Sequence, residues 1–114
     1  MKEDKNIKVY INDIHDCILK IEEYLEGISE ERFCEDYEKQ DSVLRRLEII
    51  GEAVKRLPED LKGDYPNIPW KDIAGTRDVL IHEYSGVNLK RIWKTVKKDL
   101  PELKNQVGEI LKKD

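Results

Sequence analysis

One apolar stripe dominates the first quarter of the chain. Isoleucine or leucine recurs at alternating intervals of four and three residues, at Ile7, Ile11, Ile14, Ile18, Ile21 and Leu25. This spacing places all six side chains on one side of an α-helix, because helix neighbours are three or four residues apart. The mean interval lies near the coiled-coil value and favours antiparallel packing in a helical bundle. We expect Gly27 to end this helix.

Similar stripes predict further helices in the rest of the chain. Ser29 can cap a short helix through Phe33, and another begins near Asp41 or Ser42 and ends at Pro58. Two prolines and a glycine make residues 63–69 a loop. Later helices are expected at residues 70–84, with a kink or break at Gly75, and at 89–111, bent by Pro101. The sequence therefore predicts an all-α, four- to five-helix antiparallel bundle, with residues 1–114 forming a single domain.

Composition favours a small subunit that pairs with a second copy. The 114 residues are 39% hydrophobic and 40% charged, which supports only a lean core, so a subunit interface would help. No apolar run reaches the length of a membrane span, and the polar start leads into no signal-peptide core. Cys17 and Cys34 make a poor disulfide framework and are expected to act as small buried hydrophobes. We expect a cytoplasmic homodimer, or a larger oligomer, with no membrane contact.

The net charge of −4 argues against a broad nucleic-acid surface. Any contact with RNA must then be local. Acidic residues such as Glu22 and Glu23 could lie on the opposite face. Cations that could supply such a contact, or could simply form solvated helix faces, are Arg45, Arg46, Lys90, Arg91, Lys94, Lys97 and Lys98.

The chain has two histidines, the residue best suited to proton transfer near neutral pH. His15 lies in the middle of the first helix and fits a surface or interface side chain. His82 lies near a helix end, in a group of polar residues within an otherwise apolar helix. On a straight helix, Arg77 and His82 would lie about 140° apart, so spacing alone does not bring them together. Either the helix deforms near Gly75 or Ser85, or a second chain completes the site.

Several types of chemistry have no support in the sequence. No group of His, Cys and carboxylates has metal-ligand spacing, and no phosphate loop or dinucleotide fingerprint is present. We therefore expect neither a metal nor a cofactor. Metal-free RNA cleavage remains open, because the substrate's own 2′-hydroxyl is the nucleophile. His82 could transfer protons and Arg77 could neutralise the phosphoryl oxygens.

The sequence resembles a known family in several segments. The segment Arg77-Asp-Val-Leu-Ile-His82-Glu-Tyr84 matches the Arg-x4-His-x-Tyr motif of the HepT toxins, which belong to the HEPN superfamily of helical ribonucleases. The segments 44–57, 68–77, 86–93 and 99–103 also resemble the family, in the same order. The similarity covers most of residues 7–111.

The resemblance implies a HEPN-like homodimer with two motifs lining an interface cleft. It implies a toxin of a toxin–antitoxin system that is a metal-independent endoribonuclease, with Arg77 and His82 as the catalytic pair and Asp78 orienting a neighbour. The implied partner is a minimal nucleotidyltransferase antitoxin, MntA, which silences the toxin by transferring AMP from ATP to Tyr84. The alternative is a non-catalytic helical subunit that presents substrate to a nucleotidyltransferase. The acidic net charge and the single motif histidine favour that alternative slightly.

Overall fold

The computed structural model describes the chain path over residues 2–82 and 88–113, and the side chains over residues 7–76 and 88–113. Every regular element in these ranges is helical, which confirms the all-α prediction. The elements are α1 (Lys2–Leu25), α2 (Glu30–Glu35), α3 (Tyr37–Arg56), α4 (Glu59–Gly63), α5 (Trp70–His82), α6 (Leu89–Lys94), the π-helix η2 (Thr95–Asp99) and α7 (Leu100–Lys112). No helix in the described ranges is long and apolar enough to cross a membrane.

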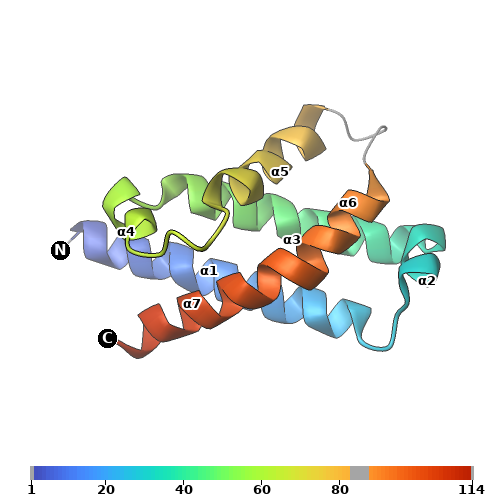
Figure 1. The fold of residues 1–114 in the computed structure, drawn as a ribbon, viewed down its shortest axis with the longest axis horizontal. Helices are drawn as coiled ribbons and strands as arrows, with labels where there is room; N and C mark the ends of the chain where they lie inside the picture. Colours follow the sequence, from blue (N-terminus) through green and yellow to red (C-terminus); the bar gives the residue numbers. More distant parts are fainter. Residues whose placement is uncertain (1, 83–87, 114) are drawn as a thin grey trace.

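The isoleucine stripe of α1 forms the centre of the core. Its members from Ile11 to Leu25 are at most 3% exposed, while Ile7 packs at the edge of the core. α1 and α3 run side by side in opposite directions, with α7 packed on α1 and α5 packed on α3 (Figure 1). This burial of apolar surface stabilises the bundle and fixes α3 as the support on which α5 lies.

Local signals in the sequence explain where the first helices begin and end. Gly27 adopts a φ of 73°, a left-handed conformation that favours glycine and ends α1 as predicted. The Ser29 hydroxyl accepts a hydrogen bond from the Arg32 amide and caps α2. The expected start of the third helix was wrong: α3 begins at Tyr37, because the Asp36 carboxylate accepts a hydrogen bond from the Lys39 amide.

The sequence pattern does not reveal α4. This five-residue helix follows Pro58, and none of its residues is buried, so it has no apolar stripe. Of the two thiols, Cys17 is buried, as expected for a small hydrophobe, whereas Cys34 is only half-buried. Both are free cysteines.

A π-helical turn divides the C-terminal helical region. The Leu100 amide donates to the Thr95 carbonyl, five residues back, instead of four. Proline has no amide hydrogen and clashes with the carbonyl four residues before it, and the wider turn lies directly before Pro101. The sequence correctly placed an irregularity here. It lies upstream of Pro101, which occupies the first turn of α7.

Candidate functional site on α5 and its flanks

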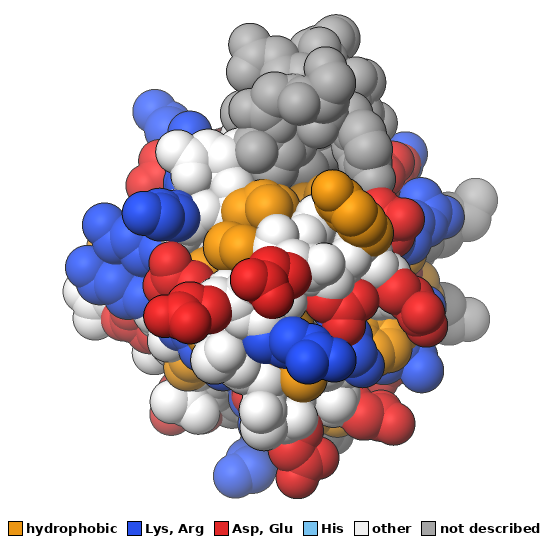
Figure 2. Space-filling view, turned by 90° about the vertical axis from the view of Figure 1, so that its right-hand side faces the viewer, with side chains coloured by type: hydrophobic (Ala, Val, Ile, Leu, Met, Phe, Trp, Pro, Cys, Tyr) orange, Lys and Arg blue, Asp and Glu red, His pale blue; other side chains and the backbone are white. Residues whose placement is uncertain are grey.

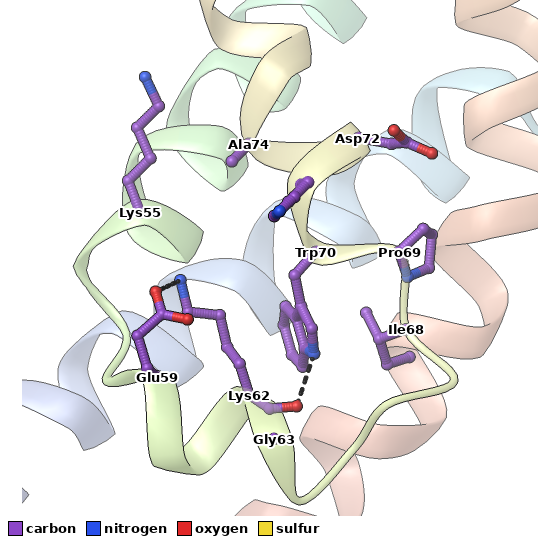
Figure 3. Close-up of a pocket in the computed structure, with 10 residues that line it drawn as sticks. Lys55, Glu59, Lys62, Gly63, Ile68, Pro69, Trp70, Asp72 and Ala74 are labelled. Carbon is purple, nitrogen blue, oxygen red and sulfur yellow. Dashed lines mark hydrogen bonds and ion pairs between the residues drawn. The ribbon is translucent and has the colours of Figure 1, made fainter.

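The N-terminal end of α5 is fixed by its first residue. The Trp70 indole nitrogen donates to the carbonyl oxygens of Lys62 and Tyr65, both at 3.0 Å. The Trp70 side chain is 9% exposed and packs with buried Ile68. Figure 3 shows the indole pointing down towards the Lys62 carbonyl. The helix is therefore held to α4 and to the following loop, and Trp70 is a core residue.

One face of α5 is buried against α3 up to the residue before Arg77. Ile73 and Thr76 are 2% and 8% exposed and lie about one turn apart. The Thr76 hydroxyl donates to the Asp72 carbonyl at 3.0 Å, so this buried polar group is satisfied within the helix. The turn of α5 that precedes the predicted motif is therefore anchored in the core.

The predicted site residues fall in the last turns of α5. Arg77, Asp78 and His82 lie on its helical path, but their side chains are outside the described residues. Tyr84 is outside the described residues altogether. The structure thus places three of these four positions on one helix and leaves the proximity of their side chains as a prediction.

The sequence left two ways for Arg77 and His82 to meet: a deformed helix, or a second chain that completes the site. The path of α5 bears on the first of them. The helix runs without interruption from Trp70 to His82, so it is not split at Gly75. At about 100° per residue, Arg77 and His82 then occupy backbone positions about 140° apart. A deformation at Ser85 would lie outside the described residues. Within the described part of α5, one chain does not bring these positions to the same face.

A polar hollow of about 310 Å³ lies beside the middle of α5. Its walls come from α5 and from α6–η2, and they consist of Asp72, Thr76, Arg91, Lys94, Thr95 and Asp99. Burial raises the pKa of the Asp99 carboxyl, and the charge of Asp72 raises it further, while Lys98 and Lys94 oppose the shift. The hollow therefore combines two cations, two carboxyl groups and two threonines, and Thr76 directly precedes the predicted motif.

The sequence identifies only part of this hollow. Arg91 and Lys94 are among the predicted local cations. Thr76, Thr95 and Asp99 carry no periodic or motif signal, because their proximity depends on how α5 packs against the C-terminal helices. Among the residues with described side chains, no group of three or more His, Cys, Asp or Glu could hold a metal ion.

A larger hollow of about 610 Å³ lies beside the first residues of α5 (Figure 3). Trp70, Ile68 and Pro69 form its apolar wall, and three lysines surround it. One of them, Lys62, pairs with Glu59 at 3.3 Å. This hollow lies at the N-terminal end of the helix, whereas the predicted motif lies in its last turns. The predicted chemistry does not involve it.

The surface charge is mixed where the bundle ends at α2. Figure 2 shows Lys and Arg side chains interspersed with Asp and Glu on this face. Among the described residues on this face, there is no broad basic surface of the kind that covers nucleic-acid-binding domains.

Comparison with known proteins places the chain in a family. The family model described as "Ribonuclease HepT-like" matches residues 14–110. A protein of Caldanaerobacter subterraneus subsp. tengcongensis named "Putative RNase" is 48% identical over 111 residues, which cover 96% of this chain and 98% of that protein. The "Probable ribonuclease HepT" of Thermococcus cleftensis is 47% identical over 105 residues, covering 92% of this chain and 96% of that protein.

A third relative is longer. The protein of Methanocaldococcus jannaschii named "Gamma-glutamylcyclotransferase and putative RNase" is 46% identical over 107 residues, which cover 94% of this chain but only 48% of that protein. No solved structure matches the chain significantly. The helical architecture and these similarities define a small helical ribonuclease-like protein. The chain belongs to the HepT-like ribonuclease family.

Gly75→Ala tests whether α5 must bend. A Cβ at Gly75 would meet nothing within 4 Å, and alanine is favoured over glycine inside a helix by about 1 kcal/mol. We expect urea denaturation to show unchanged or slightly increased stability, and RNA cleavage to be retained. A variant that folds stably but loses cleavage would show that bending at Gly75 is needed, contrary to the expectation from the unbroken helix.

Proposed function

We propose that this protein is a metal-independent endoribonuclease that acts as the toxin of a toxin–antitoxin pair. The observation that carries the proposal is membership of the HepT-like ribonuclease family over residues 14–110, together with the Arg77-x4-His82-x-Tyr84 motif inside that range. Two relatives that align with this chain over nearly their whole length are named as ribonucleases. The substrate is RNA, and residues 1–114 act as one helical domain.

The proposed reaction uses the RNA's own 2′-hydroxyl. Neutral His82 accepts the hydroxyl proton while the oxygen attacks the adjacent phosphorus. The bond from phosphorus to the 5′-oxygen breaks, and a charged histidine returns a proton to the leaving oxygen. Arg77 donates hydrogen bonds to the phosphoryl oxygens, where negative charge develops. Asp78 orients one of these groups. The products are a cyclic phosphate and a free 5′-hydroxyl.

A homodimer supplies what one chain lacks. Each chain has a single motif histidine, whereas the reaction needs both a base and an acid. On an unbroken α5, helix geometry puts the backbone positions of Arg77 and His82 about 140° apart. A two-fold axis beside the end of α5 would bring together two copies of each residue in one cleft. The regularity of α5 supports this arrangement.

Silencing is proposed to act at Tyr84. An MntA-type nucleotidyltransferase would direct the Tyr84 hydroxyl oxygen to the α-phosphorus of ATP. A phosphorus–oxygen bond forms, pyrophosphate leaves, and the hydroxyl proton passes to a base or to solvent. The bulky anionic AMP group would then fill the cleft and repel RNA phosphate.

The enzyme proposal is tested by cleavage of RNA in the presence of a chelator. Wild type is expected to cut RNA, while His82→Ala lowers the rate by about 10²- to 10⁴-fold and Arg77→Ala by about 10²- to 10³-fold. His15→Ala is the matched control, because His15 is a half-buried histidine of α1 outside the motif. If wild type and all three variants leave RNA equally intact, the non-catalytic accessory subunit becomes the better account.

The modification is tested separately by mass spectrometry. After incubation with the cognate nucleotidyltransferase and ATP, we expect one AMP group on the peptide that contains Tyr84, and none in Tyr84→Phe. RNA cleavage should fall in proportion to the modified fraction. An adduct on another residue, or full cleavage by fully modified protein, would contradict the proposed silencing.

A further inference from the structure

Positive charge is concentrated in one short segment of this acidic protein. Residues 88–99 contain five cations and one carboxylate, a net charge of +4, while the whole chain carries −4. The rest of the chain is therefore strongly negative, at −8. We call these cations the α6 strip, which consists of Lys90, Arg91, Lys94, Lys97 and Lys98.

The α6 strip lies along one side of α6 and η2. At about 100° per residue, its three members on α6 (Lys90, Arg91 and Lys94) span roughly 100° of the helix circumference. All five side chains are exposed. The opposite side is anchored in the core by Ile92, Val96 and Leu100, each at most 7% exposed. The bundle therefore holds the strip in a fixed orientation towards solvent.

These cations are not paired with carboxylates in the described part of the chain. No strip residue has an ion pair within 4 Å to another described residue, although Lys104 pairs with Glu22 at 2.9 Å and Arg56 with Glu52 at 3.4 Å. Lys97 lies over the Trp93 ring at 4.7 Å. Elsewhere in the described part of the chain, carboxylates form ion pairs with lysines and arginines. Among the described residues, the charge of this stretch is therefore not matched by an ion pair and can meet an external anion.

The strip adjoins the helix that carries the predicted motif. Arg91 and Lys94 line the same polar hollow as Thr76, which directly precedes Arg77 in the chain. The hollow thus connects the strip to the middle of α5. An anionic polymer bound along α6–η2 would pass beside the last turns of α5.

We propose that the α6 strip binds the phosphate backbone of the RNA substrate and guides one strand to the motif on α5. This inference rests on the proposed ribonuclease function and assigns the residues that hold the RNA outside the cleavage site. Lysine and arginine bind phosphate through charge-assisted hydrogen bonds without reading the base sequence. The strip contributes affinity for RNA and positions the strand along the protein, while the motif residues carry out the cleavage.

An RNA strand fits the strip better than an acidic protein does. Protein interfaces rely on exposed aromatic or aliphatic anchors near the centre of the contact. The one aromatic residue within the strip segment, Trp93, is half-buried and packs on Phe33 with ring centroids 5.5 Å apart. The large hydrophobic residues that are exposed, Val9, Leu19 and Tyr37, lie on α1 and α3. The strip thus offers charge without an apolar anchor.

Equilibrium binding of a fluorescent single-stranded RNA tests the proposal in full-length protein. All variants carry His82→Ala, so that binding is measured without cleavage. The strip variant is Lys94→Gln with Lys98→Gln. The matched control is Lys20→Gln with Lys112→Gln, which removes the same charge from exposed positions on α1 and α7. Circular dichroism confirms that each variant folds.

The readout is the slope of log affinity against log salt concentration. Each lost phosphate contact lowers the slope by about 0.7 for a single strand, so the strip variant should lose about 1.4 and the control almost nothing. Equal slopes in both variants would overturn the proposal even if wild type cuts RNA. A normal RNA slope together with lost binding to the nucleotidyltransferase would also overturn it and assign the strip to that partner. If wild type fails to cut RNA but the strip slope falls as stated, the ribonuclease proposal fails and the RNA-binding strip stands.

Discussion

A regular α-helix turns about 100° at each residue, and this geometry limits what α5 can do alone. From Trp70 to His82 the helix is unbroken, so Arg77 and His82 occupy backbone positions on different sides of it. Catalysis by this pair requires a second surface that brings the two groups to one phosphate. A second copy of the chain supplies such a surface most simply, because two-fold symmetry duplicates every group.

The rest of the fold holds α5 in place for this role. The isoleucine stripe of α1 buries one side of α3, and α3 in turn supports α5. Trp70 fixes the start of α5 through two hydrogen bonds, and Ile73 and Thr76 bury its inner face. Beside this helix, α6–η2 presents the exposed cations of an otherwise acidic chain. α5 thus buries one face in the bundle and carries the motif positions in its last turns, while α6–η2 carries the α6 strip.

Much of this architecture could be predicted from local patterns. The stripe of α1, the end of this helix at Gly27 and the capping by Ser29 each depend on residues close in sequence, and each was correctly inferred. The start of α3 was missed because Asp36 lies at the junction of two helices, where it ends one and caps the next. The short helix α4 has no buried residue and so leaves no periodic signal.

The site was less predictable for a physical reason. A motif identifies Arg77, His82 and Tyr84 as a group, but their convergence depends on tertiary and subunit contacts that no spacing encodes. The polar hollow is formed by Thr76 and Asp99 only because α5 packs near η2. The irregular turn before Pro101 could be located from that proline, yet its π-helical geometry depends on the hydrogen bond from Leu100 to Thr95.

The central claim, that two chains share the catalytic groups, is tested most directly by mixing wild type with an inactive variant. Equal amounts of wild type and His82→Ala are unfolded together, refolded, and assayed for RNA cleavage beside each protein alone. If one cleft needs the histidines of both chains, only the quarter of the dimers that contain two wild-type chains cuts RNA, so the mixture has roughly a quarter of wild-type activity. Half of wild-type activity, in a sample shown to contain mixed dimers, would mean that each wild-type chain acts alone and would contradict the shared site.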